Sequence, residues 1–279
     1  MIADILDIKP GITAFTGSGG KTSLIKRLAA ELTGKAIPDD RKTAGDAAER
    51  LQYNNVIVCT TTHIMRPADM PVFDAADPDI SKDIDCGAQA GSQEVRPKLL
   101  AFLSENTGLA VCVGVTDPEN PAKLVSFPID IIRSATGENT YILVEADGAK
   151  HMPVKAHNDR EPVIPEGCEH VIVVVGAEGF DKRICDAVHR PEIFASIAGV
   201  DVHETVTPQN LAKVLKAEKD KFGTGRLQVF VNRSEEMDEN DRDVFLCSED
   251  ISNAGKLAEL TGWEVYAGAA VKGIAVRIQ

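Results

Sequence analysis

The fold is decided by the stretch Gly17-Ser18-Gly19-Gly20-Lys21-Thr22-Ser23, which lies between two patterned segments. Before it, Ile12–Phe15 is a short apolar run typical of a strand, and after it residues 21–32 place apolar side chains on one helical face. Glycines between a strand and a helix let backbone N–H groups turn toward an anion, and the helix N-terminus adds partial positive charge. The stretch therefore predicts a nucleotide-binding loop formed by Gly17, Ser18, Gly19, Gly20, Lys21, Thr22 and Ser23.

Two side chains of this loop have specific expected roles. Lys21 should reach the β- and γ-phosphates of a nucleoside triphosphate, and Thr22 should be a ligand of Mg²⁺. The full phosphate-loop pattern has a further glycine at the position that Phe15 occupies here. A glycine-rich turn without a ligand is the alternative, but Gly-Lys-Thr at the start of a helix favours ATP or GTP with Mg²⁺.

The rest of the chain alternates strand-length apolar runs with helical patterns, which indicates an α/β fold with a mostly parallel sheet covered on both faces. We expect a three-layer sandwich like that of P-loop NTPases, formed as a single domain over residues 1–279 with irregular excursions at about 33–54 and 66–95. The expected strands are 12–15, 56–60, 109–113, 141–144, 170–175, 227–231 and 264–266, and the expected helices are 21–32, 97–106, 128–135, 207–216 and 239–261.

Composition excludes several classes of partner. Lys and Arg number 30 against 43 Asp and Glu, a formal net charge of −13, so we expect neither nucleic acid nor an anionic membrane as a partner. No apolar run approaches the roughly 20 residues of a membrane span, and the acidic start is unlike a signal peptide. The six cysteines are scattered without a C-x-x-C pair. These features predict a cytoplasmic protein with reduced thiols.

Two acids end the apolar run 141–144. Glu145 and Asp147 are two residues apart, so on an extended chain they point to the same side. A phosphate loop needs an acid at the end of a neighbouring strand to organise Mg²⁺. We expect Asp147, with Glu145 as the alternative, to complete a metal site with Thr22; a strand that ends in solvated acids is the other reading.

The expected strand 56–60 ends in three hydroxyls and an imidazole, Thr60-Thr61-Thr62-His63. Strand ends near a phosphate loop often carry the group that contacts the γ-phosphate or positions water. Thr61 and His63 are therefore candidate catalytic residues. A hydrogen-bonded loop histidine explains His63 equally well.

The loop 148–165 contains three prolines and many polar side chains, and a rigid polar loop beside a nucleotide site is usually functional. Lys155, Arg160 and Glu161 are the candidates for contacts with a substrate or a transition state; charges that pair with one another are the alternative. Histidines and a cysteine also gather near this loop without a standard zinc spacing, which makes a metal or selenium site a minor hypothesis: His151, His157, Cys168 and His170.

The expected strand 227–231 is followed by Asn232-Arg233-Ser234-Glu235. Many GTP-binding proteins end the equivalent strand in Asn-Lys-x-Asp, whose carboxylate accepts two hydrogen bonds from guanine. Asn232 and Glu235 are therefore candidates for reading the base, and a polar turn after a strand is an equal alternative.

These motifs together resemble the YqeC family, accessory proteins of selenium-dependent molybdenum hydroxylases. The resemblance runs from Gly17 to about Glu235 and depends on short matching segments: G-x-G-G-K-T-S, T-T-T-H-I at Thr60–Ile64, E-A-D-G at Glu145–Gly148, E-P-V-I-P at Glu161–Pro165 and V-H-R-P-E at Val188–Glu192. The family usually has Pro where this chain has His157. The resemblance implies a nucleotide-dependent role in maturation, with a molybdenum hydroxylase or its cofactor-loading proteins as partners.

The sequence thus predicts an Mg²⁺-dependent nucleotide-binding protein that hydrolyses NTP slowly during cofactor insertion into a molybdenum hydroxylase. Two alternatives stay open. One is a phosphoryl or nucleotidyl transferase whose small acceptor is held by Lys155, Arg160 and Glu161. The other is a non-enzymatic binding module, in which the nucleotide stabilises a conformation that docks a partner.

Overall fold

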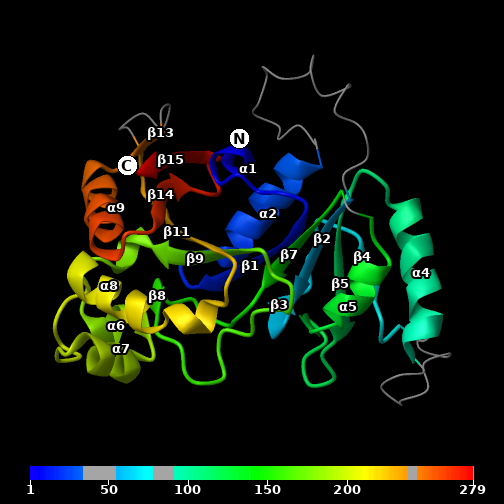
Figure 1. The fold of residues 1–279 in the computed structure, drawn as a ribbon, viewed down its shortest axis with the longest axis horizontal. Helices are drawn as coiled ribbons and strands as arrows, with labels where there is room; N and C mark the ends of the chain where they lie inside the picture. Colours follow the sequence, from blue (N-terminus) through cyan, green and yellow to red (C-terminus); the bar gives the residue numbers. More distant parts are fainter. Residues whose placement is uncertain (34–54, 78–90, 138, 238–243, 279) are drawn as a thin grey trace. The chain divides into compact units, whose positions relative to one another are not determined.

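The computed structural model describes residues 1–33, 55–77, 91–137, 139–237 and 244–278 (Figure 1). The chain divides into two compact units, which are described separately. Unit 1 comprises Met1–Ile8, Ala14–Arg27 and Ala146–Gln279, and unit 2 comprises Lys9–Thr13 and Leu28–Glu145. The prediction of a single domain over residues 1–279 stays a prediction.

Unit 1 contains a sheet in the order β15-β14-β11-β9-β1. The pairs β9–β11 and β11–β14 are parallel, and β15 runs antiparallel to β14. All seven residues of β9 are buried, which requires cover on both faces of the sheet. The strands are β1 (Gly11–Gly17), β9 (His170–Gly176), β11 (Arg226–Asn232), β14 (Glu264–Ala269) and β15 (Ile274–Ile278).

Helices of unit 1 bury one face of this sheet. Alternate residues of β9, Val171, Val173 and Val175, pack in one apolar cluster with residues of the helices that follow. Figure 1 shows α6, α7 and α8 grouped together and α9 beside β14. The helices and short elements are α1 (Ile2–Ile5), α2 (Lys21–Leu32), α6 (Ile184–Ala187), α7 (Pro191–Ala198), α8 (Pro208–Ala217), α9 (Ser248–Thr261), η1 (Ala177–Gly179), η2 (Lys219–Phe222), β8 (Val154–Lys155), β10 (Val188–His189), β12 (Glu235–Met237) and β13 (Val244–Leu246).

Helix α8 shows how local sequence fixes an element. The Thr207 hydroxyl accepts a hydrogen bond from the Asn210 N–H, and the Asn210 side chain accepts one from the Thr207 N–H. Pro208 occupies the first helical position, where no N–H is needed. This capping box starts the helix where the sequence predicts it.

Unit 2 contains a sheet in the order β7-β2-β5-β6-β3, with β4 paired to β5. The pairs β7–β2, β2–β5 and β5–β4 are parallel, whereas the pairs β5–β6 and β6–β3 are antiparallel. Helices α4 and α5 pack against each other. The elements are β2 (Asn55–Thr60), β3 (His63–Met65), β4 (Val72–Asp74), α4 (Gly91–Glu105), β5 (Ala110–Thr116), β6 (Lys123–Val125), α5 (Ile129–Ser134) and β7 (Thr140–Glu145).

The expected α/β class with a mostly parallel sheet is confirmed. Most expected elements are present, with errors where local sequence was ambiguous. The helix expected at 97–106 begins at Gly91, so Pro97 lies inside it. The helix expected at 239–261 is replaced in its described part by β13, a turn and α9, because Val244–Leu246 pairs as a strand with β12.

Other differences concern elements that the sequence analysis missed. The excursion expected at 66–95 contains strand β4 and the start of α4, while residues 78–90 lie outside the described residues, as do 34–54 of the other excursion. Helix α7 and strand β15 were not predicted. Among the described helices, none is long and apolar enough to cross a bilayer.

Candidate functional site

Three glycines of the loop between β1 and α2 have left-handed backbone conformations. The φ angles are +89° at Gly17, +85° at Gly19 and +108° at Gly20. A Cβ atom at Gly19 would lie 2.2 Å from the backbone nitrogen of Gly176, so no side chain fits there. Strand β1 continues through Gly17, which places Phe15 inside the buried strand and explains why no glycine is needed at that position.

Neighbouring segments hold the loop in this shape. The Ser18 N–H donates to the Val174 carbonyl at 2.8 Å, and its hydroxyl donates to the Met152 carbonyl. The Asn232 side-chain amide donates to the Gly19 carbonyl at 2.9 Å, while its oxygen accepts from the Ala270 N–H at 2.9 Å. Asn232 is buried, and its amide links the loop at Gly19 to the backbone of Ala270.

Lys21 and Asp147 form a buried ion pair at the start of α2. The Lys21 Nζ lies 2.9 Å from Asp147 Oδ1 and donates to the Gly17 carbonyl at 2.7 Å. The second carboxylate oxygen, Oδ2, accepts from the Gly17 N–H and from the Thr16 hydroxyl. Burial opposes ionisation of Asp147, but the positive charge of Lys21, the hydrogen bond from His157 and the charge of Lys155 together outweigh it and hold the pKa of this carboxyl well below its usual range.

Lys155 brings a second ammonium group to the same carboxylate. Its Nζ lies 2.9 Å from Asp147 Oδ2 and 2.6 Å from Glu161 Oε2. Arg190 reaches the same Glu161 oxygen at 2.9 Å. Burial opposes ionisation of Glu161, but hydrogen bonds from Arg190 and Lys155 outweigh that effect, so the pKa of Glu161 is lowered. Positive and negative side chains therefore alternate along one series of ion pairs. The series begins at Lys21, beside the glycine loop, continues through Asp147, Lys155 and Glu161, and ends at Arg190.

His157 connects this cluster to α8. Its Nε2 lies 2.8 Å from Asp147 Oδ2, and its Nδ1 lies 2.7 Å from Glu218 Oε2. The His157 N–H also donates to Glu218 at 2.6 Å. Burial disfavours the charged ring, but hydrogen bonds to the two carboxylates raise the pKa of His157. The Asp147–His157–Glu218 chain therefore holds Asp147 through Oδ2, whereas Lys21 pairs with Oδ1.

The histidine and cysteine group named from the sequence does not form one site. His157 contacts acids, whereas His170 contacts Gln228 at 2.8 Å and lies on β9. Within the described parts of the chain, no three His, Cys, Asp or Glu side chains are placed to hold a metal ion. This arrangement gives the metal-cargo hypothesis no support.

His189 lies on β10, the strand paired with Val154–Lys155. Burial and the positive charges of Arg190 and Lys155 lower the pKa of its ring to about 4. Its Nδ1 atom is buried, and no hydrogen-bond partner for it is found among the described residues. His189 is therefore a neutral ring beside the lysine and acid cluster, and the sequence analysis did not single it out.

The candidate residues at the end of β2 and β7 lie in unit 2. The Thr60 hydroxyl and the Thr61 N–H both donate to the Glu145 carbonyl, at 2.8 and 3.1 Å. Glu145 is buried, whereas His63 is 57% exposed with its Nε2 3.7 Å from Asp117 Oδ2. Their proposed roles in water positioning and metal binding stay predictions.

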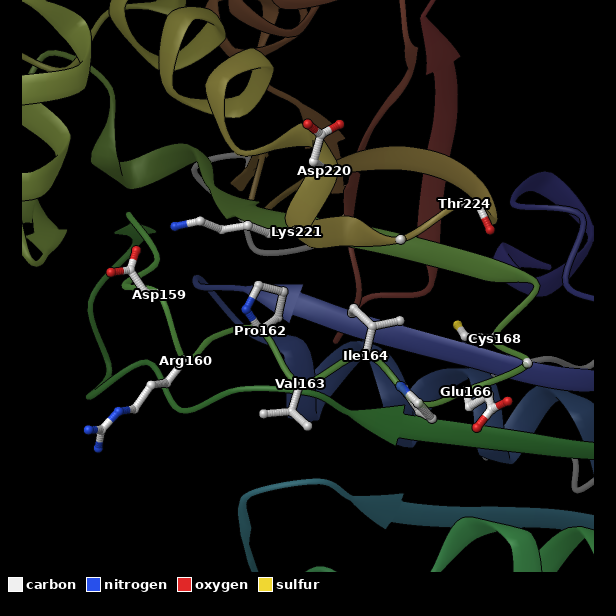
Figure 2. A pocket seen from close by; sticks show the side chains of 13 residues that line it. Asp159, Arg160, Pro162, Val163, Ile164, Glu166, Cys168, Asp220, Lys221 and Thr224 are labelled. Atoms are coloured by element: carbon white, nitrogen blue, oxygen red, sulfur yellow. The ribbon is translucent and has the colours of Figure 1, made fainter.

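Arg160 lies in different surroundings from Lys155 and Glu161. It is exposed and borders a cavity of about 550 Å³ that is lined by residues 159–160, 162–168, 220–221 and 223–224. Figure 2 shows Pro162, Val163 and Ile164 between the two ends of this cavity, with Arg160 extending away from them. The three residues expected to hold one substrate therefore divide into an ion pair, formed by the buried Lys155 and the partly buried Glu161, and an exposed arginine.

The turn after β11 places Arg233 beside the loop. Arg233 is exposed, has φ of +64° and forms an ion pair with Glu178 of η1. The backbone of Glu235 is part of β12, and its side chain lies outside the described part of the structure. Base recognition by Asn232 and Glu235 stays a prediction, and Asn232 has the loop-holding contacts given above.

The structure brings together Lys21, Asp147, Lys155 and Glu161, all named from the sequence. It adds His157, Glu218 and Arg190 to their cluster. Arg190 had a sequence signal, since it lies in the V-H-R-P-E segment. Glu218 had none, because its partner is 61 residues away along the chain.

A glycine loop with these conformations, a buried lysine and a helix N-terminus suits the phosphates of a nucleotide. The fit of Mg²⁺ depends on the hydroxyl of Thr22, the second residue of α2, and on Asp147. Both Asp147 oxygens face ammonium groups at 2.9 Å, so a metal bound there would have to share this carboxylate with Lys21 and Lys155.

Comparison with known proteins identifies one family. The model described as "YqeC protein" matches residues 46–192, slightly over half of the chain. The "Uncharacterized protein YqeC" of Escherichia coli (strain K12) is 28% identical over 218 residues, which cover 77% of this chain and 71% of that protein. No solved structure matches significantly.

Proposed function

The chain belongs to the YqeC family, and from this premise we propose that it binds a nucleoside triphosphate with Mg²⁺ at the Gly17–Thr22 loop and hydrolyses it slowly. The observation that carries the proposal is the buried cluster in which Lys21 and Lys155 converge on Asp147 beside three left-handed glycines. Such a cluster offers backbone donors and two ammonium groups to a polyphosphate.

Each residue of the cluster has a role in this proposal. The loop N–H groups and Lys21 hold the β- and γ-phosphates, and Thr22 with Asp147 holds the metal. Bound Mg²⁺ supplies positive charge to the phosphate oxygens. Lys155, which is fully buried and 2.9 Å from Asp147, would neutralise charge that develops on the γ-phosphoryl group.

The proposal also gives a reason for the many partners of Asp147. Asp147 is completely buried, and one carboxylate holds both lysines close to the glycine loop. A phosphate group that takes over part of the contact with Lys21 leaves Asp147 paired with Lys155 and His157. The carboxylate therefore keeps a positive partner in both states.

Calorimetric titration with ATP, GTP and CTP, each with Mg²⁺, tests the proposal. Wild type should bind at least one of them with micromolar affinity, and Lys21→Ala should lose that binding. Lys26→Ala, a lysine on the same helix, is the matched control and should bind as wild type does. Wild type that binds none of the three would refute nucleotide binding.

Hydrolysis is tested separately by phosphate release with and without Mg²⁺. Slow release that falls on Lys21→Ala and Asp147→Ala supports an NTPase, and full Mg²⁺-dependent release by both variants contradicts these roles. Binding without any release would favour the non-enzymatic module. Nothing in the cluster favours a transferase, since Arg160 is exposed on the cavity while Lys155 and Glu161 are paired with each other.

The family resemblance extends the proposal to the maturation of a selenium-dependent molybdenum hydroxylase. In a cell that makes such an enzyme, loss of this protein should lower the hydroxylase activity while its polypeptide level is maintained. Expression of wild type should restore the activity, and Lys21→Ala should not. Unchanged hydroxylase activity after the loss would contradict this role and leave nucleotide binding intact.

A further inference from the structure

Glu178 of η1 lies at the border of the glycine loop, and its side chain is 29% exposed. Gly176, the last residue of β9, touches Gly19: a Cβ at Gly19 would lie 2.2 Å from its nitrogen. A Cβ at Gly176 would in turn lie 2.7 Å from Glu178 Oε2. One residue therefore separates this carboxylate from the loop.

The two oxygens of Glu178 have different surroundings. Oε1 is paired with the guanidinium of Arg233. Oε2 is buried, and among the residues that the structure describes it has no hydrogen-bond partner. Buried carboxylate oxygens are normally satisfied, so an unsatisfied one beside a binding loop points to a donor that comes from outside the chain.

Arg233 fixes the direction of this carboxylate. It follows Asn232, whose amide holds Gly19, and its Nε lies 3.8 Å from the position of a Cβ at Gly20. A non-glycine residue with φ of +64° is uncommon and is kept only where the surroundings require it. Arg233 and Glu178 thus meet beside Gly19 and Gly20.

We propose that Glu178 Oε2 accepts a hydrogen bond from the nucleoside part of the bound nucleotide. The group must be a neutral donor, because a carboxylate repels phosphate and the phosphates have Lys21 and the loop N–H groups as partners. Two groups of a nucleotide have this chemistry, the hydroxyls of the ribose and the exocyclic amine of the base. The flat guanidinium of Arg233 is suited to stacking on a base next to it.

This inference rests on the proposed nucleotide binding and deepens it by assigning a specificity residue. The proposed nucleotide binding and the role of Glu178 can be tested separately. Binding of any nucleoside triphosphate by wild type tests the site, and the ratio of affinities between two analogues tests Glu178. The probes are GTP, ITP and 2′-deoxy-GTP, and ATP, 2′-deoxy-ATP and 3′-deoxy-ATP, each with Mg²⁺. ITP lacks the base amine of GTP, and the deoxy analogues lack one ribose hydroxyl each.

Wild type should bind the nucleotide that carries the donor about tenfold or more tighter than the analogue that lacks it. In Glu178→Gln, which keeps the size of the side chain and turns an NH₂ group toward the ligand, this ratio should fall below about twofold. The probe pair that shows the ratio tells whether the donor is the base amine or a ribose hydroxyl. Glu166→Gln, an exposed glutamate on the cavity, is the control and should keep the wild-type ratio.

Thermal unfolding checks that each variant is folded. If Glu178→Gln does not fold, Glu178→Asp shortens the same side chain by one methylene and should also reduce the ratio. A ratio that persists in the folded variant, or a wild type that binds all six probes equally, overturns the role of Glu178 and leaves nucleotide binding in place. A wild type that binds no probe overturns both.

Discussion

Asp147→Asn is the change with the clearest expected effect on stability. The side chain keeps its shape, but a neutral amide replaces the carboxylate that faces Lys21 at 2.9 Å and Lys155 at 2.9 Å. Both lysines are almost completely buried, with 3% and 0% side-chain exposure, so water cannot take the place of the lost charge. Removal of one partner from a buried ion pair costs about 3–5 kcal/mol.

The assay is urea unfolding followed by circular dichroism at neutral pH. Thermal unfolding is a second measurement. Since the melting temperature of large domains falls by roughly 2–4 °C per kcal/mol, a loss of about 3–5 kcal/mol in unfolding free energy should lower it by roughly 6–20 °C. Asp159→Asn is the control, since Asp159 is an exposed aspartate of the same loop region, and its unfolding free energy should stay within about 0.5 kcal/mol of wild type. A loss below about 1 kcal/mol for Asp147→Asn would refute the view that this carboxylate balances two buried charges.

A double-mutant cycle separates the pair from the rest of the site. Lys155→Met alone leaves Asp147 with Lys21 and His157, and Asp147→Asn alone leaves Lys155 with Glu161. If the two charges interact directly, the double variant should be more stable than the sum of the single losses predicts, by about 0.5–3 kcal/mol. Additive losses would contradict a direct interaction.

Three further predictions concern single positions. The pKa of Glu161 is lowered in the folded state, so ionised Glu161 stabilises the fold above its usual pKa of 4.5, and this contribution is lost as the pH falls through the lowered pKa. The difference in unfolding free energy between wild type and Glu161→Gln should therefore shrink as the pH is lowered below 4.5. Gly19→Ala should lower the unfolding free energy by more than about 1–2 kcal/mol and weaken nucleotide binding, because the added Cβ would lie 2.2 Å from a backbone atom and the φ of Gly19 is left-handed. Gly148→Ala is the control and should do neither, since no atom lies within 4 Å of the added Cβ. Urea unfolding measures the stability of both variants, and calorimetry measures their nucleotide binding. Thr207→Ala should cost about 1 kcal/mol of unfolding free energy by removing the cap of α8, and an unchanged urea midpoint would contradict the capping box.

Much of the fold was predictable because its signals are local. The strand, loop and helix around Lys21 and the start of α8 at Thr207 follow from glycine, proline and hydroxyl residues at fixed offsets. Strand β15 was missed because its pairing with β14 is what defines it, and a short run such as Ile274–Ile278 has no local signal of comparable strength. The early start of α4 was missed because Pro97 was read as a helix start.

The site was predictable only where its residues lie in motifs. Lys21 and Asp147 follow from the loop and from the acids after a strand, and the structure places them in one ion pair. Glu218 could not be found from sequence, because only the fold brings the end of α8 to His157. Glu178 was missed for the same reason, since its position depends on the packing of Gly176 against Gly19.

The Asn232 amide has a consequence for the order in which this protein is made. Its two hydrogen bonds link the carbonyl of Gly19 to the N–H of Ala270, so the loop at the start of the chain is anchored to a residue synthesised about 250 positions later. A nascent chain on the ribosome that ends before residue 270 lacks this anchor and the β14–β15 pair behind it. The glycine loop can therefore gain all of these contacts only after residue 270 has been synthesised.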